Sequence, residues 1–172
     1  MKVIRLSLDH ADKAVRELSD YLDSLDSRVR ELLKRLGDIG VRGAKVRFAG
    51  ARYDGINDVT VNDAEWTSDD TLVIKASGQA ILFIEFGAGI HNESHPLAEQ
   101  LNIMPHGTYG KRQGMKESWT YYGSMANARA GGQQVRDGVI RTRGNDASRS
   151  MYDTAKEMRN RVREIAIEVF KR

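Results

Sequence analysis

ILFIEFGAGIHNESHP, residues 81–96, is the part of the chain from which its architecture is most directly inferred. It begins with an apolar run that one carboxylate, Glu85, interrupts, and the run breaks at Gly87 before two histidines follow. A short apolar run bounded by glycines is typical of a strand buried on both faces. We therefore predict a buried strand over residues 79–87. The residues that shape its tight exit are Glu85, Phe86, Gly87 and Gly89.

Glu85 is the one charged side chain in this apolar run. Burying a carboxylate without a partner is costly, so an arginine, a group of backbone N–H donors or a raised pKa must accompany it if it is buried. A general base would need a second catalytic group nearby, and none is evident in the sequence. We favour a structural carboxylate, bonded to the turn amides that follow Gly87.

The segments on the N-terminal side of this run alternate between apolar and polar residues. NDVTVNDAEW (57–66) and TLVIKASG (71–78) have the period of half-buried strands, and TSDD lies between them as a turn. They predict a hairpin. With residues 79–87 as a third strand, the middle of the chain forms a small antiparallel sheet.

Helical periodicity dominates both ends of the chain. Apolar residues recur at spacings of three and four from Asp9 to Gly37 and again over residues 151–170, which predicts two amphipathic helices. The first is long enough to invite a partner helix, in the same chain or in another subunit. We predict that its stripe ends at Gly37 and that residues 39–50 continue as a second helix, despite Gly40 and Gly43, which disfavour helix by about 1 kcal/mol each. Alternation over residues 3–8 predicts a short edge strand.

Residues 106–149 differ from the rest of the chain. Glycine recurs every few residues, Lys and Arg outnumber Asp and Glu by 8 to 3, and no periodic apolar face is visible. A stretch of this length without structure is unusual inside a compact domain. We expect a long excursion that becomes ordered against another molecule.

Composition and charge limit the function classes. The 172 residues suffice for one domain, and the absence of cysteine excludes disulfides, thiolate nucleophiles and Cys-based zinc sites. We find no signal-peptide pattern and no apolar run long enough to cross a bilayer, so no membrane role is expected. The net charge is +4 over residues 1–53, −8 over residues 54–99 and +7 over residues 100–172. This pattern indicates either neutralisation within one chain or attraction between the acidic and basic parts of neighbouring copies.

Metal and nucleotide chemistry have weak signals. Two histidines four apart bind zinc as a pair when they share a helix face, but glycines and Pro96 around His91 and His95 disfavour a helix there. The alternative for them is a solvated loop on the rim of an interface. No glycine-rich segment matches a phosphate-binding motif, and no frame surrounds a nucleophilic serine. A metal-dependent hydrolase remains as a third hypothesis. Its ligands would be His91, Glu93, His95 and His106.

Basic and aromatic residues interleave in the glycine-rich segment. Such residues can contact nucleic acid through phosphate neutralisation and base stacking, and they also supply the strongest contacts in protein interfaces. We therefore treat them as candidates for an interface or for a surface that faces DNA. They are Tyr109, Lys111, Arg112, Lys116, Trp119, Tyr121, Arg136, Arg141 and Arg143.

The order of several segments adds a resemblance to this picture. They are FAGARYDGINDVTV (48–61), ASGQAILFIEFGAG (76–89), HGTYG (106–110), RTRGN (141–145) and MYDTAKEMRNRVREIAIEVF (151–170). Together they resemble the gene-product-ten-like family of tailed-phage morphogenesis proteins, the neck, head-tail joining or tail-completion components of phages and prophages. The resemblance spans about residues 30–170. It implies a non-enzymatic α+β subunit without a cofactor, arranged in a ring that is by family analogy a hexamer.

These inferences give one expectation for the whole chain. We expect a single α+β domain, with a small antiparallel sheet packed by a long N-terminal helix and a C-terminal helix. Its parts are residues 1–53 (strand and helices), 54–105 (sheet and acidic loops), 106–149 (basic excursion) and 150–172 (C-terminal helix). The expected role is structural: a virion subunit, made in the host cytoplasm, that contacts its own copies, other neck and tail proteins and, in passing, DNA. The alternative is a nucleic-acid-binding module that uses residues 109–143.

Overall fold

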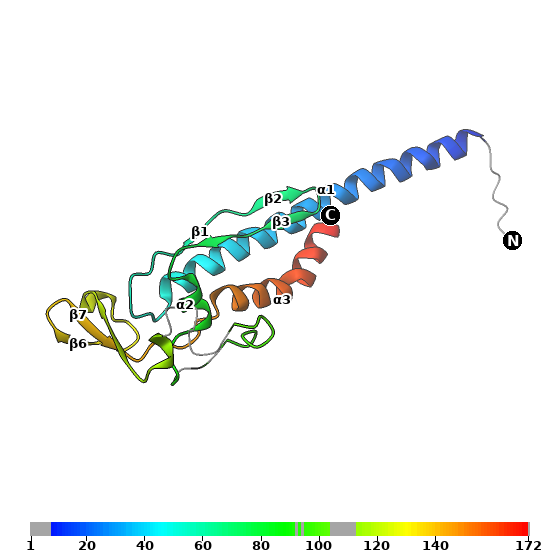
Figure 1. The fold of residues 1–172 in the computed structure, drawn as a ribbon. Helices are drawn as coiled ribbons and strands as arrows, with labels where there is room; N and C mark the ends of the chain where they lie inside the picture. The colour runs from blue at the N-terminus through cyan, green and yellow to red at the C-terminus, as the bar shows by residue number, and fades with distance from the viewer. Residues whose placement is uncertain (1–7, 92, 94, 104–112, 172) are drawn as a thin grey trace.

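A computed structural model describes residues 8–91, 93, 95–103 and 113–171 of the chain. Its longest element is α1 (Leu8–Gly50), a helix of 43 residues. The second long helix, α3 (Ser150–Phe170), packs along the C-terminal half of α1, and small antiparallel sheets complete the body (Figure 1). The predicted α+β class with a long N-terminal and a C-terminal helix is therefore confirmed.

The predicted break in the first helix at Gly37 is wrong, because α1 runs without interruption to Gly50. Gly37 and Gly40 lie where other elements approach most closely. A Cβ on Gly37 would lie 2.4 Å from Leu72, and one on Gly40 would lie 2.3 Å from Ile74 and 2.6 Å from the sulfur of Met158. The packing that these small residues permit offsets their low helix propensity.

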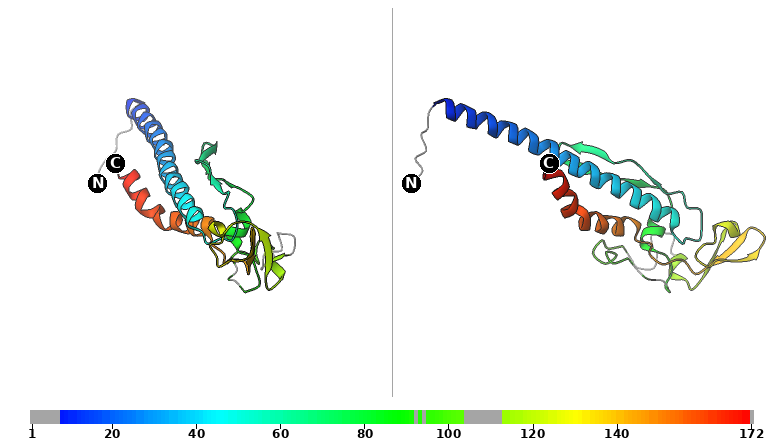
Figure 2. Two further views of the ribbon diagram at one scale, coloured as in Figure 1. Left: turned by 90° about the vertical axis from the view of Figure 1, so that its left-hand side faces the viewer. Right: turned by 180° about the vertical axis from the view of Figure 1, so that it is seen from behind.

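Two groups of buried side chains form the core. The larger lies between the end of α1, the hairpin and the segment after it; it comprises Val41, Ala44, Phe48, Ala51, Val61, Ala80 and Ile84. The smaller joins α1 to the end of α3 and comprises Leu36, Ile165 and Val169. The N-terminal half of α1 carries no part of either core and projects beyond the body (Figures 1 and 2).

The predicted hairpin is confirmed. Its strands pair antiparallel as β1 (Thr60–Val61) with β4 (Ala76–Ser77) and as β2 (Glu65–Ser68) with β3 (Thr71–Val73). The turn falls at Asp69 and Asp70, within the TSDD segment. Arg30 of α1 holds the hairpin tip, since it forms an ion pair with Asp69 and stacks over the ring of Trp66 at 5.5 Å.

The predicted strand over residues 79–87 is wrong, because its apolar run forms the short helix α2 (Ile81–Phe86). Asp58 fixes the turn at Gln79 and Ala80, from which the chain enters the helix. Its carboxylate accepts hydrogen bonds from the backbone N–H groups of Gln79 (2.8 Å) and Ala80 (2.9 Å), so it holds the turn just ahead of α2 without capping the helix itself. These bonds hold the pKa of Asp58 below its ordinary value, so the carboxylate is ionised at neutral pH.

The glycine-rich segment contains regular structure in its described part, residues 113–149, which corrects the expectation of an excursion ordered only by another molecule. Three strands, β5 (Trp119–Tyr122), β6 (Gln133–Arg136) and β7 (Val139–Thr142), form an antiparallel sheet in the order β5-β7-β6. Two short 3-10 helices, η1 (Gln113–Met115) and η2 (Met125–Asn127), flank β5. The predicted N-terminal strand lies outside the described residues except for Leu8, which begins α1.

Candidate functional site

Three places in the body combine polar and aromatic groups: the junction around Glu85, a pocket beside Asp54, and the outer face of the β5-β7-β6 sheet. The junction lies where α2 meets the start of α3. Both oxygens of the Glu85 carboxylate accept backbone hydrogen bonds from the first turn of α3, from Met151 N–H at 2.8 Å and from Tyr152 N–H at 3.0 Å. Glu85 is buried, so these bonds form in a low-dielectric setting where each is strong.

His95 completes the junction. Its Nδ1 accepts a hydrogen bond from Leu97 N–H at 3.0 Å, so the proton of the neutral ring lies on Nε2. That nitrogen faces Oε1 of Glu85 at 3.3 Å, without a well-aligned hydrogen bond. Phe86 and Tyr152 enclose the ring, with centroids 4.6 Å and 5.1 Å away. His95 is therefore a packed core residue, and the expectation of a solvated loop histidine is wrong for it.

Glycines at the end of α2 let two backbones meet. Gly87 has φ +79° and ψ 174°, a conformation that only glycine adopts readily, and Gly89 has φ +96°. Between them Ala88 pairs with Asn145 in an isolated β-bridge, with N–O distances of 2.8 Å and 2.9 Å. The predicted tight turn at these glycines exists, but it follows a helix. Glu85 is bonded to the amides of α3 and not to the turn amides that were predicted.

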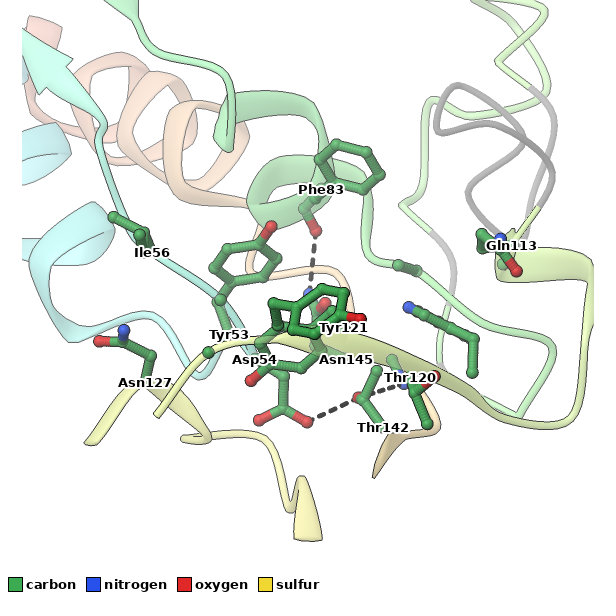
Figure 3. Close-up of a pocket in the computed structure, with 17 residues that line it drawn as sticks. Tyr53, Asp54, Ile56, Phe83, Gln113, Thr120, Tyr121, Asn127, Thr142 and Asn145 are labelled. Carbon is green, nitrogen blue, oxygen red and sulfur yellow. Dashed lines mark hydrogen bonds between the residues drawn. The ribbon is translucent and has the colours of Figure 1, made fainter. Parts of the chain in front are cut away.

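A pocket of about 610 Å³ lies between the sheet, α2 and the loop that follows α1. Figure 3 shows the rings of Tyr53 and Tyr121 in this pocket, with the amide of Asn145 and Phe83 beside them. Asn145 Nδ2 donates a hydrogen bond to the carbonyl of Phe83 at 2.9 Å. Aromatic walls with a few polar groups are typical of a site that takes a small ligand or a partner's side chain.

Asp54 is the carboxylate at this pocket, and its geometry indicates a structural role. One carboxylate oxygen accepts a hydrogen bond from Ala130 N–H at 2.6 Å, and the other accepts one from the Thr142 hydroxyl at 2.7 Å. The Thr142 hydroxyl oxygen in turn accepts a hydrogen bond from Gly144 N–H at 2.9 Å. These bonds tie the sheet to the end of α1. Because both oxygens are engaged, the carboxylate is poorly placed to act as a general base.

Two of the phenols that line the pocket, those of Tyr53 and Tyr121, stay protonated at neutral pH. Burial raises the pKa of Tyr53, and the nearby charges of Asp58 and Asp54 raise it further. Burial also raises the pKa of Tyr121, with smaller contributions from Asp54 and Tyr53. The Tyr121 hydroxyl is buried and has no hydrogen-bond partner within the described part of the chain.

The outer face of the β5-β7-β6 sheet is basic. Register aligns Tyr122, Val139 and Arg136 in one row across the strands and Thr120, Arg141 and Gln133 in the next, with a register shift between Gln134 and Arg136. Val139 is buried, and the other five side chains are exposed. Arg136 and Arg141 are exposed, and Tyr122 is 86% exposed although it and Thr120 also line the pocket. Ile140 and Thr142 alternate to the inner side, where Thr142 lines the pocket.

The structure therefore divides the residues predicted to face an interface or DNA. Arg136 and Arg141 lie together on the outer face, whereas Trp119 and Tyr121 line the pocket on the inner face. Lys116 and Arg143 are exposed just outside the strands. The others, Tyr109, Lys111 and Arg112, lie outside the described residues.

The pocket was not foreseen from the sequence. Asp54 bonds residues that follow it by 76 and 88 positions, and no local pattern marks such a pairing. Within the described residues no group of three or more His, Cys, Asp or Glu side chains could hold a metal ion. Of the four residues in the metal hypothesis, His91 and Glu93 are exposed, His95 is buried and His106 lies outside the described residues.

Comparison with protein-family models, with curated proteins and with solved structures gives no match to this chain. Among the described helices, none has the length and apolar character needed to cross a membrane.

Proposed function

We propose that this protein is a non-enzymatic structural subunit of a tailed phage or prophage, which forms a ring with its own copies at the neck and joins or completes the tail. One observation carries the proposal: exposed apolar side chains and exposed basic side chains lie at opposite ends of an elongated body, where we place the contacts between subunits. The right-hand view of Figure 2 follows α1 from its projecting N-terminal end to the β5-β7-β6 sheet at the other end. A subunit that bridges neighbours needs such separated contacts.

The first surface is the projecting part of α1. Large apolar side chains are exposed there, among them Val15, Leu18, Tyr21 and Leu22. Leaving a row of apolar side chains in water is unfavourable, and contiguous exposed apolar surface is characteristic of a protein interaction site. The second surface is the basic outer face of the sheet with Arg136, Arg141 and Tyr122. Arg and Tyr are the residue types that dominate binding energy in protein interfaces.

The roles of the buried carboxylates also favour a structural protein. Asp54 and Glu85 are each bonded through both oxygens to hydrogen-bond donors that hold separate segments together. Their polar groups thus stabilise the body and leave its surfaces for contacts. The order of segments that resembles the phage morphogenesis family points in the same direction and supplies the proposed location, the head-proximal end of the tail, and the proposed partners, other neck and tail proteins.

Light scattering at low and high salt tests this proposal. We expect a discrete multimer of the purified protein, visible as rings by electron microscopy, whose mass falls as salt rises because the acidic middle and basic ends of neighbouring copies attract each other. A monomer at both salt concentrations, over a wide range of protein concentration, would contradict self-assembly.

Binding of nucleic acid is the second candidate function, and the presence of two exposed arginines, Arg136 and Arg141, on neighbouring strands of one sheet favours it. We predict that changing both residues to Gln weakens binding to duplex DNA and reduces the slope of log K against log salt by about 2, since each phosphate contact contributes about 0.9 to that slope. Titration of labelled DNA at several salt concentrations measures it. The charge-matched control is Arg159→Gln with Arg163→Gln, two exposed arginines of α3. Equal losses in the two double variants would leave the sheet face without a specific role.

A further inference from the structure

We propose that residues 11–29 of α1 pair with the same residues of a second copy of this chain as a parallel, in-register, two-stranded coiled coil. The inference deepens the proposed function and rests on its self-association, because it names one surface through which copies meet. A two-fold pair closes at two copies, so the ring itself needs further contacts elsewhere on the body. Apolar residues repeat through this segment with the alternating spacing of three and four that defines a heptad seam. They are Ala11, Val15, Leu18, Leu22, Leu25 and Val29.

The seam is exposed where α1 leaves the body. Val15, Leu18 and Leu22 are 67%, 59% and 52% exposed. Charged residues occupy much of the remaining circumference of this segment, including Arg16, Glu17, Asp20 and Asp23. An apolar stripe with charged residues around it is what one helix of a coiled coil presents before its partner binds.

The same seam is already used for helix packing further along α1. Its next residues, Leu32, Leu36 and Ile39, pack against Ile165 and Val169 of α3. The packing of α3 on this seam ends at the last residue of α3, Phe170, whose carbonyl accepts a hydrogen bond from Arg28 at 3.2 Å. One continuous heptad repeat is therefore covered by α3 on the body side of Arg28 and is uncovered on the other side. A second helix can continue the packing that α3 begins.

Residue types along the seam favour two strands. In the heptad register, the a positions are Val15, Leu22 and Val29, and the d positions include Leu18 and Leu25. β-Branched residues at a with Leu at d favour parallel dimers over larger bundles. Residues 11–29 span about 28 Å, just under three heptads. Such a length is short for an isolated pair, but here the body anchors each helix before pairing.

The flanking residues favour the parallel orientation. Positions e carry Asp12, Ser19 and Asp26, and positions g carry Ala14, Tyr21 and Arg28. An antiparallel pair aligns e with e of the partner and brings Asp12 next to Asp26, which is repulsive. A parallel pair aligns g with the following e, so Tyr21 meets Asp26 and no like charges meet. The acidic excess along the segment also disfavours an anionic lipid surface as the occupant.

A single introduced cysteine tests the inference, because the natural chain has no cysteine. In a parallel, in-register pair the two copies of residue 18 face each other across the seam, within the range of about 4.4–6.8 Å between Cα atoms that a disulfide needs. We expect Leu18→Cys to form a disulfide-linked dimer in most molecules under mild oxidation. The matched control is Asp20→Cys, one half-turn away on the charged side, which stays reduced. Circular dichroism verifies that both variants keep their helix content.

The outcomes separate this inference from the proposed function. An antiparallel pair gives a disulfide only when Leu18→Cys is mixed with Leu22→Cys, and that result would overturn the proposed orientation. Equal cross-linking at residues 18 and 20 indicates random collision and overturns the pairing. A stable multimer in which residue 18 stays reduced leaves the ring proposal intact and overturns the coiled coil. A monomer with no disulfide contradicts both.

Discussion

Glu85→Ala is expected to lower the free energy of unfolding by about 3–5 kcal/mol, the range for removing one partner from a buried charged network. The substitution leaves the N–H groups of Met151 and Tyr152 without their acceptor at the start of α3. It also leaves Nε2 of His95 facing a cavity in place of a carboxylate. Each buried donor that loses its partner is unfavourable by about 1–3 kcal/mol. Urea denaturation followed by circular dichroism measures the change.

Glu85→Gln removes the negative charge of residue 85 but keeps the size and shape of its side chain. The amide keeps one acceptor oxygen but turns its NH₂ group toward a second donor, so we expect about half of the loss seen with Ala. Glu168→Ala is the surface control, because that glutamate is exposed and its pairing with Arg35, at 3.2 Å, is that of a surface ion pair. Such pairs contribute about 1 kcal/mol or less. If Glu85→Ala costs no more than this control, the carboxylate does not hold α3 in place.

Gly87→Ala is expected to destabilise the protein by about 3 kcal/mol or more. Its backbone conformation is strained for any residue with a Cβ, which alone costs about 1–3 kcal/mol. A Cβ would also lie 2.7 Å from the backbone nitrogen of Ala147 and 2.9 Å from the carbonyl oxygen of Asn145. These are backbone atoms, and moving them disturbs the bridge between Ala88 and Asn145.

Gly138→Ala is the matched control for this prediction. Gly138 also has a positive φ, of +67°, but nothing lies within 4 Å of the Cβ that alanine would add. We therefore expect it to lose only the conformational part, about 1 kcal/mol. Thermal unfolding of the two variants compares them. Equal losses would mean that the contact between the two backbones at Gly87 adds nothing to stability.

Much of the fold follows from local patterns in the sequence. Apolar stripes at spacings of three and four identify α3 and most of α1, since burial of such a stripe is the main stabilisation that a helix gains in a protein. Alternation on both sides of the TSDD turn identifies the hairpin. The residue types at the candidate surfaces, apolar on the projecting helix and basic in residues 113–149, can be read directly from the chain.

Two features of α1 and α2 could not be predicted in this way. The run ILFIEF fits either a buried strand or a buried helical turn. The carboxylate of Asp58, some twenty positions earlier, favours the helix because it fixes the turn just ahead of it. Gly37 and Gly40 predict a break in α1 from propensity alone. Leu72, Ile74 and Met158 fill the space that these glycines leave, and this packing outweighs a difference of about 1 kcal/mol per glycine.

The sequence by itself determined that Glu85 needs a partner, because a buried carboxylate requires donors wherever it lies. It also determined the heptad repeat of α1 and the chemical character of residues 113–149. Only the tertiary structure decided that the donors to Glu85 are amides 66 and 67 positions later in the chain. It also decided that α3 packs on only part of the heptad seam. In the sheet, it decided that Arg136 and Arg141 are exposed while Tyr121 lines the pocket. The physical reason is that sequence periodicity shows only which residues share a face of one helix or strand. Hydrogen-bond partners, strand register and the burial of that face depend on which distant elements pack against it.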